Sequence, residues 1–235
     1  FTDINPFAYR EEINLRYITK AADFGNPDMV ILPGTKNTME DLKWLRQTGL
    51  ENKILQHAEH EKLIFGICGG YQMLGNMISD PHGIEGSGSI KGLGLLQMQT
   101  IFQPEKTRTR VTGMFQSIEG ILKELSGVRL EGYEIHMGIS NRNEGAKSLT
   151  KLDSGDVDGT FSRNVYGTYV HGIFDEEQVV KGIVRALLQG KGYDVSSVES
   201  FDLLAYKEEQ YNQLADIIRD SMDMEAIYAI IEKGI

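Results

Sequence analysis

The stretch from Leu63 to Gly75 constrains the fold of this chain more than any other. Leu63 to Ile67 is a short run of apolar and small residues, typical of a buried strand, and a helical pattern begins at Tyr71. The turn between them has the form Gly-x-Cys-x-Gly around Cys68. This is the cysteine counterpart of the nucleophile elbow, in which a strained strand-to-helix turn lifts one side chain above a sheet. Glycine fits both flanking positions because a β-carbon would collide there with neighbouring backbone.

Two roles are open to Cys68, the single cysteine of the chain. A cysteine at the first turn of a helix lies near the positive end of the helix dipole and near unpaired N–H groups, and both favour the reactive thiolate. The alternative is an inert thiol that fills a gap in the core. The surrounding glycines and the strand–turn–helix pattern favour the nucleophile.

Length, charge and hydropathy narrow the class of protein. A chain of 235 residues is of ordinary size for one domain, and 24 basic against 34 acidic residues give a net charge of −10. Nucleic acids and anionic membranes attract basic surfaces, so we expect neither as a partner. No apolar run approaches the roughly 18 residues that span a bilayer, and no signal peptide is visible. One cysteine cannot form an internal disulfide, which fits a reducing cytoplasm.

The elements predicted up to the elbow alternate as strand, turn, helix, strand and helix, which is typical of a parallel α/β sheet. Apolar runs predict strands at 15–18 and 29–32, and apolar spacing predicts helices that include Leu42 and Leu50. Thr38 to Asp41 resembles a capping box with aspartate in place of glutamate.

The chain after the elbow turns β-rich and ends in helices. The glycine-rich segment 79–89 predicts a flexible surface loop or a substrate-facing loop. Strands are predicted at 93–99, 109–114, 128–136, 147–152 and 165–170, and helices at 176–189, at 201–218 and around Met224 to Ile231. The apolar face of the last helix predicts ordinary core packing, with a docking surface for a missing partner domain as the alternative. We therefore predict an α/β fold with a mostly parallel, flavodoxin-like central sheet, flanking helices and an added β-rich middle section.

A thiolate nucleophile needs a base, and the chain has five histidines. His57 and His60 lie three residues apart in a charged helical stretch and are expected to be solvated; without a third ligand nearby they predict no metal site. His82 lies in the glycine-rich loop, where a role in the turn suffices. His136 and His171 each follow a predicted strand, and functional groups gather beyond the carboxyl ends of strands in parallel sheets. The strand before His171 is the stronger one, so His171 is the better general base.

Several segments together carry a resemblance to a known family. They are the elbow Gly66 to Gly75, the stretch Tyr166 to Asp175, the segment Val30 to Arg46, the motif Gly132 to Gly138 and a tail from Tyr206 to Ala215. Over essentially its whole length the chain resembles the class I glutamine amidotransferases of the cobyric acid synthase type. Relatives share the elbow, whereas the Pro-Gly-Thr-Lys-Asn-Thr loop and the tail favour this type.

The resemblance implies hydrolysis of glutamine to glutamate and ammonia. Cys68 would attack the side-chain amide of glutamine, and His171 would carry the thiol proton to the departing ammonia. Backbone N–H groups at Gly69 and around Gly34 would stabilise the oxyanion that forms.

Two further residues concern glutamine itself. Gln72, one helical turn after the nucleophile, matches the family position that holds the substrate. His136 would border the pocket. The resemblance implies neither a metal nor a cofactor for this domain.

The sequence departs from many class I enzymes at Ile173, where they carry a glutamate that orients the histidine. The cobyric acid synthase type resembles this chain in lacking that glutamate, so we expect a dyad of Cys68 and His171. Glu134 and Asp175 are two carboxylates that would orient the ring instead, and the sequence does not decide between them.

Members of the family begin with an ATP-binding synthetase domain that carries a phosphate loop, and residues 1–235 contain none. We expect one amidotransferase domain, 1–235, cut from a longer chain without the ATP-binding domain and without one strand. A sheet edge or an apolar groove should then be exposed. The resemblance places ATP and Mg²⁺ only in the synthetase domain, through which ammonia would reach a corrinoid acceptor in cobalamin biosynthesis.

Other classes remain open. The amidotransferase subunits that act on lipid II and the cobyrinate a,c-diamide synthases share the elbow, and a DJ-1-like cysteine hydrolase also uses an elbow cysteine. A docking module without catalysis would tolerate the loss of Cys68.

Overall fold

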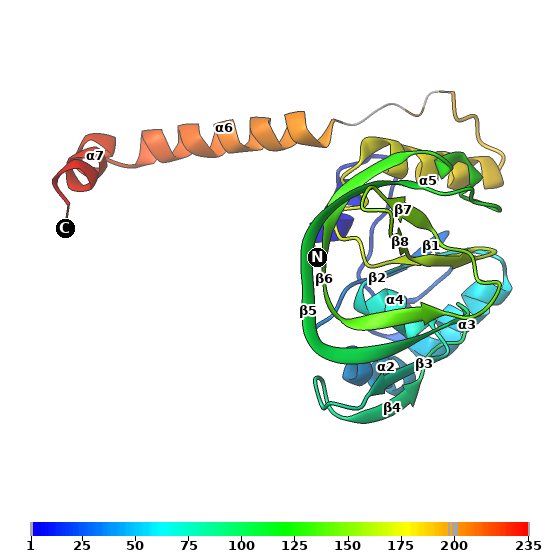
Figure 1. Ribbon diagram of the computed structural model, residues 1–235. Coiled ribbons are helices and arrows are strands. Elements are labelled where there is room, and N and C mark those ends of the chain that lie inside the picture. The colour runs from blue at the N-terminus through cyan, green and yellow to red at the C-terminus, as the bar shows by residue number, and fades with distance from the viewer. Residues whose placement is uncertain (1, 197, 199–201, 235) are drawn as a thin grey trace. The chain divides into compact units, whose positions relative to one another are not determined.

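The computed structural model describes residues 2–196, 198 and 202–234. The chain divides into two compact units, Phe1–Glu199 and Ser200–Ile235, which are described separately. The first unit contains two β-sheets with their connecting helices, and the second contains two helices (Figure 1). The expectation of a single domain stays a prediction, because this division concerns packing and not function.

The central sheet places the elbow between two parallel neighbours. Its four strands lie in the order β1 (Met29–Leu32), β2 (Leu63–Ile67), β10 (Val165–Thr168) and β9 (Thr160–Ser162). β2 pairs in parallel with both β1 and β10, and β9 is antiparallel to β10. All five residues of β2 are buried, as expected for a central strand covered on both faces. The carboxyl ends of β2 and β10 therefore lie at one edge of the sheet, where Cys68 and His171 follow them.

The helices of the first unit lie before, between and after its strands. They are η1 (Thr2–Ile4), α1 (Asn5–Ala8), η2 (Ala21–Asp23), α2 (Thr38–Gln47), α3 (Leu50–Glu59), α4 (Gly69–Leu74), η3 (Lys123–Leu125) and α5 (Glu177–Gly190). The predicted cap of α2 is wrong by one residue. Asn37 is the N-cap, and its side chain accepts the N–H of Glu40 (3.2 Å), since the hydroxyl of Thr38 bonds to Gln72 (3.0 Å) instead.

The β-rich middle section forms a second sheet. Its strands are β3 (Met77–Asp80), β4 (Gly88–Lys91), β5 (Met98–Phe115), β6 (Arg129–Arg142), β7 (Thr150–Leu152) and β8 (Val157–Asp158). Figure 1 shows β5 and β6 as a long curved ribbon with α4 on its concave side. The predicted fold class, a mostly parallel central sheet with flanking helices and an added β-rich section, is confirmed.

Two boundaries in this section differ from the prediction. The strand expected at 93–99 begins only at Met98. The loop expected at 79–89 includes the paired ends of β3 and β4, where Ser79 lies opposite Ser89. Strand pairing uses backbone N–H and C=O groups, so a polar, glycine-rich sequence does not prevent it.

An apolar groove lies beside the open edge of the central sheet. β1 pairs with β2 alone, so its other edge is unpaired among the described residues. The groove has a volume of about 1420 Å³, and Leu15, Tyr17, Ile31 and Leu187 are among its lining residues. The strand predicted at 15–18 is wrong, because this segment pairs with no described strand. An exposed edge and an apolar groove match the expectation, while the missing strand stays a prediction.

The second unit consists of α6 (Leu203–Ser221) and α7 (Met224–Lys233). The side chains of Asp202 and Asp223 cap them by accepting backbone N–H groups (2.9 and 3.0 Å). Within this unit α7 has no buried residue, and Ile231 is 71 % exposed, so core packing of its apolar face stays a prediction. Two helices offer too little surface to enclose a core of their own. No helix in the described ranges is both long and apolar enough to cross a bilayer.

Candidate active site

The chain makes a strained turn at Cys68, between β2 and α4. The backbone angles of Cys68 are φ 50° and ψ −109°, a positive φ that residues other than glycine rarely adopt. A β-carbon at Gly66 would lie 2.8 Å from the Tyr71 nitrogen, and one at Gly70 would lie 2.0 Å from the Leu32 oxygen. These close contacts explain why glycine occupies both positions, and they confirm the predicted strand–turn–helix geometry.

The elbow holds Cys68 at the N-terminus of α4. The N–H of Cys68 donates to the Thr168 oxygen on β10 (2.9 Å), and its own oxygen accepts the N–H of Gln72 (2.9 Å). The residue is 8 % exposed, and its thiol donates to the Ile135 oxygen over 3.7 Å. The sulfur therefore lies near the first N–H groups of a helix, where a negative charge is favoured.

His171 lies at the same end of the sheet. Its backbone exchanges two hydrogen bonds with Tyr133 of β6 (2.8 and 3.0 Å), and the two rings stack with centroids 5.1 Å apart. Gly34 packs against both predicted catalytic residues. A β-carbon on Gly34 would lie 3.0 Å from His171 Cε1 and 3.5 Å from Cys68 Cβ. The predicted nucleophile and base are therefore close neighbours.

A carboxylate that the sequence does not point to completes this arrangement. Asp3 Oδ2 accepts a hydrogen bond from His171 Nδ1 (2.9 Å), and Oδ1 accepts the N–H of Gly172 (2.8 Å). The other ring nitrogen, Nε2, is buried and makes no hydrogen bond to any described residue. Glu134 lies near His136 instead, with 3.8 Å between Glu134 Oε2 and His136 Nε2. The expected dyad is therefore extended to a Cys68–His171–Asp3 arrangement.

Asp3 and His171 shift each other's proton affinity. Burial alone would lower the pKa of His171, but the hydrogen bond to Asp3 and the nearby Cys68 sulfur outweigh it and raise that pKa from 6.5 to about 9. Burial alone would raise the pKa of Asp3, and the hydrogen bonds from His171 and Gly172 hold it below its ordinary 3.8. Near neutral pH the pair is therefore an imidazolium beside a carboxylate, and an imidazolium stabilises a nearby thiolate.

These shifts predict a pH-dependent contribution to stability. The raised pKa of His171 stabilises the fold fully below pH 6.5, and this contribution is lost as the pH rises through about 9. The lowered pKa of Asp3 stabilises the fold above pH 3.8, and that part is lost as the pH falls further. We expect Asp3→Asn to lower the free energy of unfolding at about pH 6 more than at about pH 10, as measured by urea denaturation. Asp23→Asn, at an exposed carboxyl, is the control; an equal loss at both pH values for Asp3→Asn would contradict the assignment.

The loop that begins at Pro33 lies against the elbow. The N–H of Gly70 donates to the Pro33 oxygen (3.1 Å), which fixes the loop beside α4. Gly69 is the first residue of α4, so its N–H has no acceptor within the helix. Gly34 and Gly69, the two predicted oxyanion donors, thus flank the residue that carries the sulfur.

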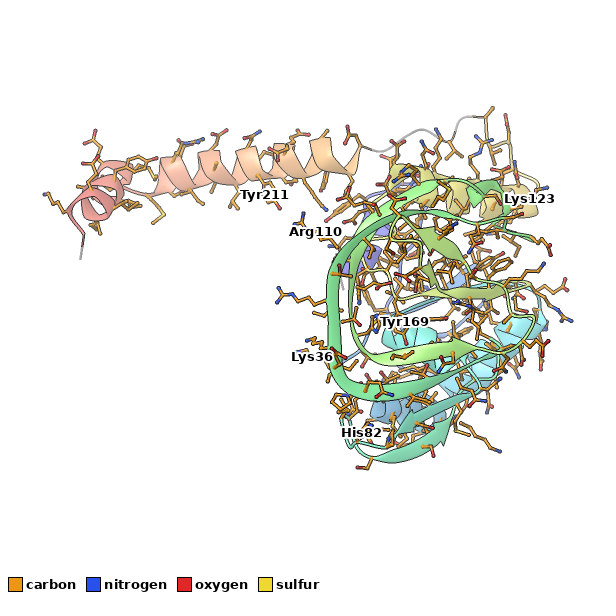
Figure 2. The ribbon with its side chains drawn as sticks, in the orientation of Figure 1. Lys36, His82, Arg110, Lys123, Tyr169 and Tyr211 are labelled. Carbon is orange, nitrogen blue, oxygen red and sulfur yellow. The ribbon has the colours of Figure 1, made fainter. Side chains whose placement is uncertain are left out.

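Gln72 lies inside the molecule with its amide held at both ends. Its side chain is 2 % exposed; Oε1 accepts the hydroxyl of Thr38 (3.0 Å) and Nε2 donates to the hydroxyl of Tyr169 (3.2 Å). Tyr169 in turn bonds to the hydroxyl of Ser140 (2.7 Å), and Figure 2 shows it on the concave side of the β5–β6 ribbon. These bonds leave the Gln72 amide one N–H and one lone pair for a ligand.

His136 joins the Gln72 side of the site. Its ring stacks on Tyr169 with 3.8 Å between centroids, and its Nδ1 lies 2.8 Å from the Gly138 oxygen. A β-carbon at Gly138 would lie only 2.4 Å from Gln72 Nε2. His136 therefore belongs to the wall around Gln72, and its contact with substrate stays a prediction.

The remaining histidines lie outside this arrangement. His57 is buried, its Nε2 lies 3.1 Å from the Leu63 oxygen, and burial lowers its pKa, so the prediction that it is solvated is wrong. His60 and His82 are exposed. Among the residues that the structure describes, no three of the types His, Cys, Asp and Glu gather as metal ligands would.

Comparison with known sequences points to one family. The profile of the CobB/CobQ-like glutamine amidotransferase domain matches residues 1–179. The chain is 50 % identical over 242 residues to the cobyric acid synthase of Ruminiclostridium cellulolyticum, an alignment that covers 100 % of this chain and 47 % of that protein. Identity to the cobyric acid synthase of Lachnoclostridium phytofermentans is 46 % over 248 residues, with 100 % and 48 % covered. The chain spans about half the length of these curated relatives.

Two solved structures resemble the fold. A crystal structure of a glutamine amidotransferase matches with a TM-score of 0.53 and 18 % identity, over 82 % of this chain and 92 % of that chain. The structure of PurLQS from Thermotoga maritima matches with a TM-score of 0.56 and 17 % identity, over 73 % and 85 %. At these identities the likeness concerns the fold alone, and it agrees with the observed α/β architecture.

Proposed function

The chain belongs to the CobB/CobQ-like glutamine amidotransferase family, and from that premise we propose that it hydrolyses glutamine at Cys68 with His171 as proton carrier. The observation that carries this proposal is the elbow cysteine packed, through Gly34, beside an imidazole that Asp3 orients. A nucleophile, a base and a group that holds the base are the parts that acyl transfer to cysteine requires.

In the first step the Cys68 thiolate attacks the side-chain carbonyl carbon of glutamine. The C=O electron pair moves to the oxygen, and the N–H groups of Gly69 and Gly34 stabilise the oxyanion by about 3–4 kcal/mol per donor. His171 holds the thiol proton and delivers it to the amide nitrogen, so the C–N bond breaks and ammonia leaves. Water then attacks the thioester, His171 takes its proton, and glutamate is released with the thiol restored.

Asp3 would serve this cycle by keeping His171 in one tautomer. Its carboxylate accepts a hydrogen bond from Nδ1–H, which keeps that proton in place. Nε2 is therefore the atom that exchanges a proton with sulfur, substrate and water. The raised pKa of His171 means that the ring keeps a proton near neutral pH, which it can deliver to the amide nitrogen. We assign substrate recognition to Gln72, whose amide has bonding capacity left, with His136 in the surrounding wall.

We assign the ammonia to a synthetase partner. The relatives named cobyric acid synthase are about twice as long as this chain, which leaves room for an ATP-binding half. In that half ATP and Mg²⁺ would activate corrin side-chain carboxylates for amidation by the ammonia. The identity of 50 % over the full chain favours this acceptor over lipid II or a cobyrinate a,c-diamide reaction. The glutaminase chemistry itself needs no cofactor.

The test is covalent labelling with diazo-oxo-norleucine, an electrophile that mimics glutamine. We expect saturable labelling, an adduct on Cys68 by mass spectrometry, and protection by added glutamine. Iodoacetamide, which needs no glutamine site, reports whether the thiol is reactive. If iodoacetamide modifies Cys68 while the glutamine mimic does not, the site does not recognise glutamine, and a cysteine hydrolase or a docking module becomes the better assignment.

A further inference from the structure

The loop between β3 and β4 reaches the site through one carboxylate, that of Glu85. Resting on the proposed function, we infer that Glu85 is a positioning residue for the glutamine site: it fixes the start of α2 and, through Thr38, the amide of Gln72. Figure 2 shows His82 of this loop at the outer end of the β3–β4 hairpin. Sequence patterns leave a surface loop and a substrate-facing loop open for this glycine-rich segment, and on this inference it is part of the recognition machinery.

The loop is held in one shape by Asp80. This fully buried carboxylate accepts four backbone N–H groups, from Ile84 (2.8 Å), Glu85 (2.8 Å), Gly86 (3.0 Å) and Ser87 (3.1 Å). Burial alone would raise the pKa of Asp80, and these four bonds hold it well below the ordinary value instead. Because Asp80 stays charged and saturated with donors, Glu85 leaves the loop from a fixed backbone position.

Glu85 bonds to the first N–H groups of α2. Its Oε2 accepts the N–H of Thr38 (2.6 Å) and that of Met39 (3.4 Å). These groups have no acceptor within the helix, and a carboxylate also interacts favourably with the positive end of a helix dipole. Asn37 accepts the N–H of Glu40 in the same first turn, so Glu85 supplies the part of the cap that Asn37 does not.

Thr38 connects this cap to the substrate-binding amide. Its hydroxyl donates to Gln72 Oε1 (3.0 Å) and lies 3.4 Å from Glu85 Oε1. A hydroxyl has one proton, so the bond to Gln72 depends on where Thr38 is held, and Glu85 holds it by its backbone. Thr38 also packs on the elbow, since a β-carbon at Gly69 would lie 3.1 Å from its hydroxyl oxygen.

The expected consequence is a change in recognition rather than in the reactivity of the sulfur. The bonds of Glu85 and Thr38 end on Gln72, whereas His171 is held by a different carboxylate, that of Asp3. Losing Glu85 should therefore weaken the binding of a glutamine-shaped ligand while the thiol keeps its environment.

The experiment measures labelling of Cys68 by diazo-oxo-norleucine over a range of concentrations. In Glu85→Ala we expect the concentration for half-maximal labelling rate to rise about tenfold, as for a lost charge-assisted hydrogen bond. Iodoacetamide labelling should keep its wild-type rate. Glu85→Gln, which retains an oxygen acceptor, should recover part of the affinity, and Glu144→Ala, at an exposed glutamate, is the matched control.

A second pair of variants separates this role from a general loss of structure. Thr38→Val removes the hydroxyl but keeps the N–H that Glu85 binds, and it should weaken labelling as Glu85→Ala does, whereas Thr38→Ser should not. The double variant of Glu85→Ala and Thr38→Val should need no higher concentration for half-maximal labelling than the more affected single variant. The reason is that both substitutions act on Gln72 through one path. An unchanged half-maximal concentration in Glu85→Ala, or additive effects in the double variant, would overturn this inference. Absence of labelling in the wild type would contradict the proposed function instead.

Discussion

Replacing Cys68 by glycine should abolish reaction with glutamine and, at the same time, give a more stable protein than replacing it by alanine. Both variants lose the only thiol of the chain, so we expect glutamine hydrolysis to fall by about 10⁴-fold or more. The measurement is release of glutamate and ammonia, with the same preparation of wild-type chain as reference. Hydrolysis retained in either variant would show that the sulfur is not the nucleophile.

The two variants should differ in stability because of the backbone at the elbow. At φ 50° and ψ −109° an alanine keeps the steric strain that Cys68 bears, and glycine does not. Such strain costs about 1–3 kcal/mol, and the greater freedom of glycine in the unfolded chain offsets about 0.4–1 kcal/mol of the relief. Urea denaturation should therefore find Cys68→Gly more stable than Cys68→Ala by about 1 kcal/mol. The opposite order would mean that the turn is unstrained.

The second large effect is expected at Asp3, where asparagine should be worse than alanine. The N–H of Gly172 holds Oδ1, so in Asp3→Asn the new amide oxygen would occupy that position and the new NH₂ group would face His171 Nδ1. Two donors would then meet, which forces the ring proton onto Nε2 and removes the base. We expect the rate of reaction of Cys68 with glutamine or its mimic to fall about 10³–10⁴-fold in Asp3→Asn and about 10²-fold in Asp3→Ala.

The check is the rate of Cys68 labelling by the glutamine mimic, followed against pH. Asp3→Asn should also lower the pH at which the imidazolium loses its proton, since the carboxylate that raises the pKa of His171 is gone. Asp23→Asn, at an exposed carboxyl, should stay close to wild type. If alanine proves as damaging as asparagine, Asp3 orients the ring but does not choose its tautomer.

The parts of the site that the sequence predicts are those with a local pattern. The elbow at Cys68 combines an apolar strand, two glycines and a helix start within a dozen residues, and every one of these signals describes the same turn. His171 follows a buried strand, and the rule that side chains gather beyond the carboxyl ends of parallel strands suffices to place it near Cys68.

The sequence does not predict the roles of Asp3 and Glu85, because their hydrogen-bond partners are remote in sequence. Asp3 precedes a short helix and meets His171 only through the fold, and Glu85 caps a helix that begins 47 residues earlier. Neither position has a periodic or motif-based signal. The same reason explains the misplaced cap of α2, where the hydroxyl of Thr38 is used by a tertiary contact instead of a local one.

The prediction that His57 is solvated is wrong for a related reason. His57 lies in a polar stretch, yet the face of α3 that it shares with Ile54 is buried, because packing is decided by position on the helix rather than by neighbours in sequence. The run 15–18 has the composition of a strand, but a strand exists only when another one pairs with it.

The hydrogen bonds of Asp3 have a practical consequence for anyone who handles this protein. A truncation that removes Asp3 takes away the group that orients His171. Kinetic comparisons between preparations that include Asp3 and preparations that lack it would therefore compare different active sites.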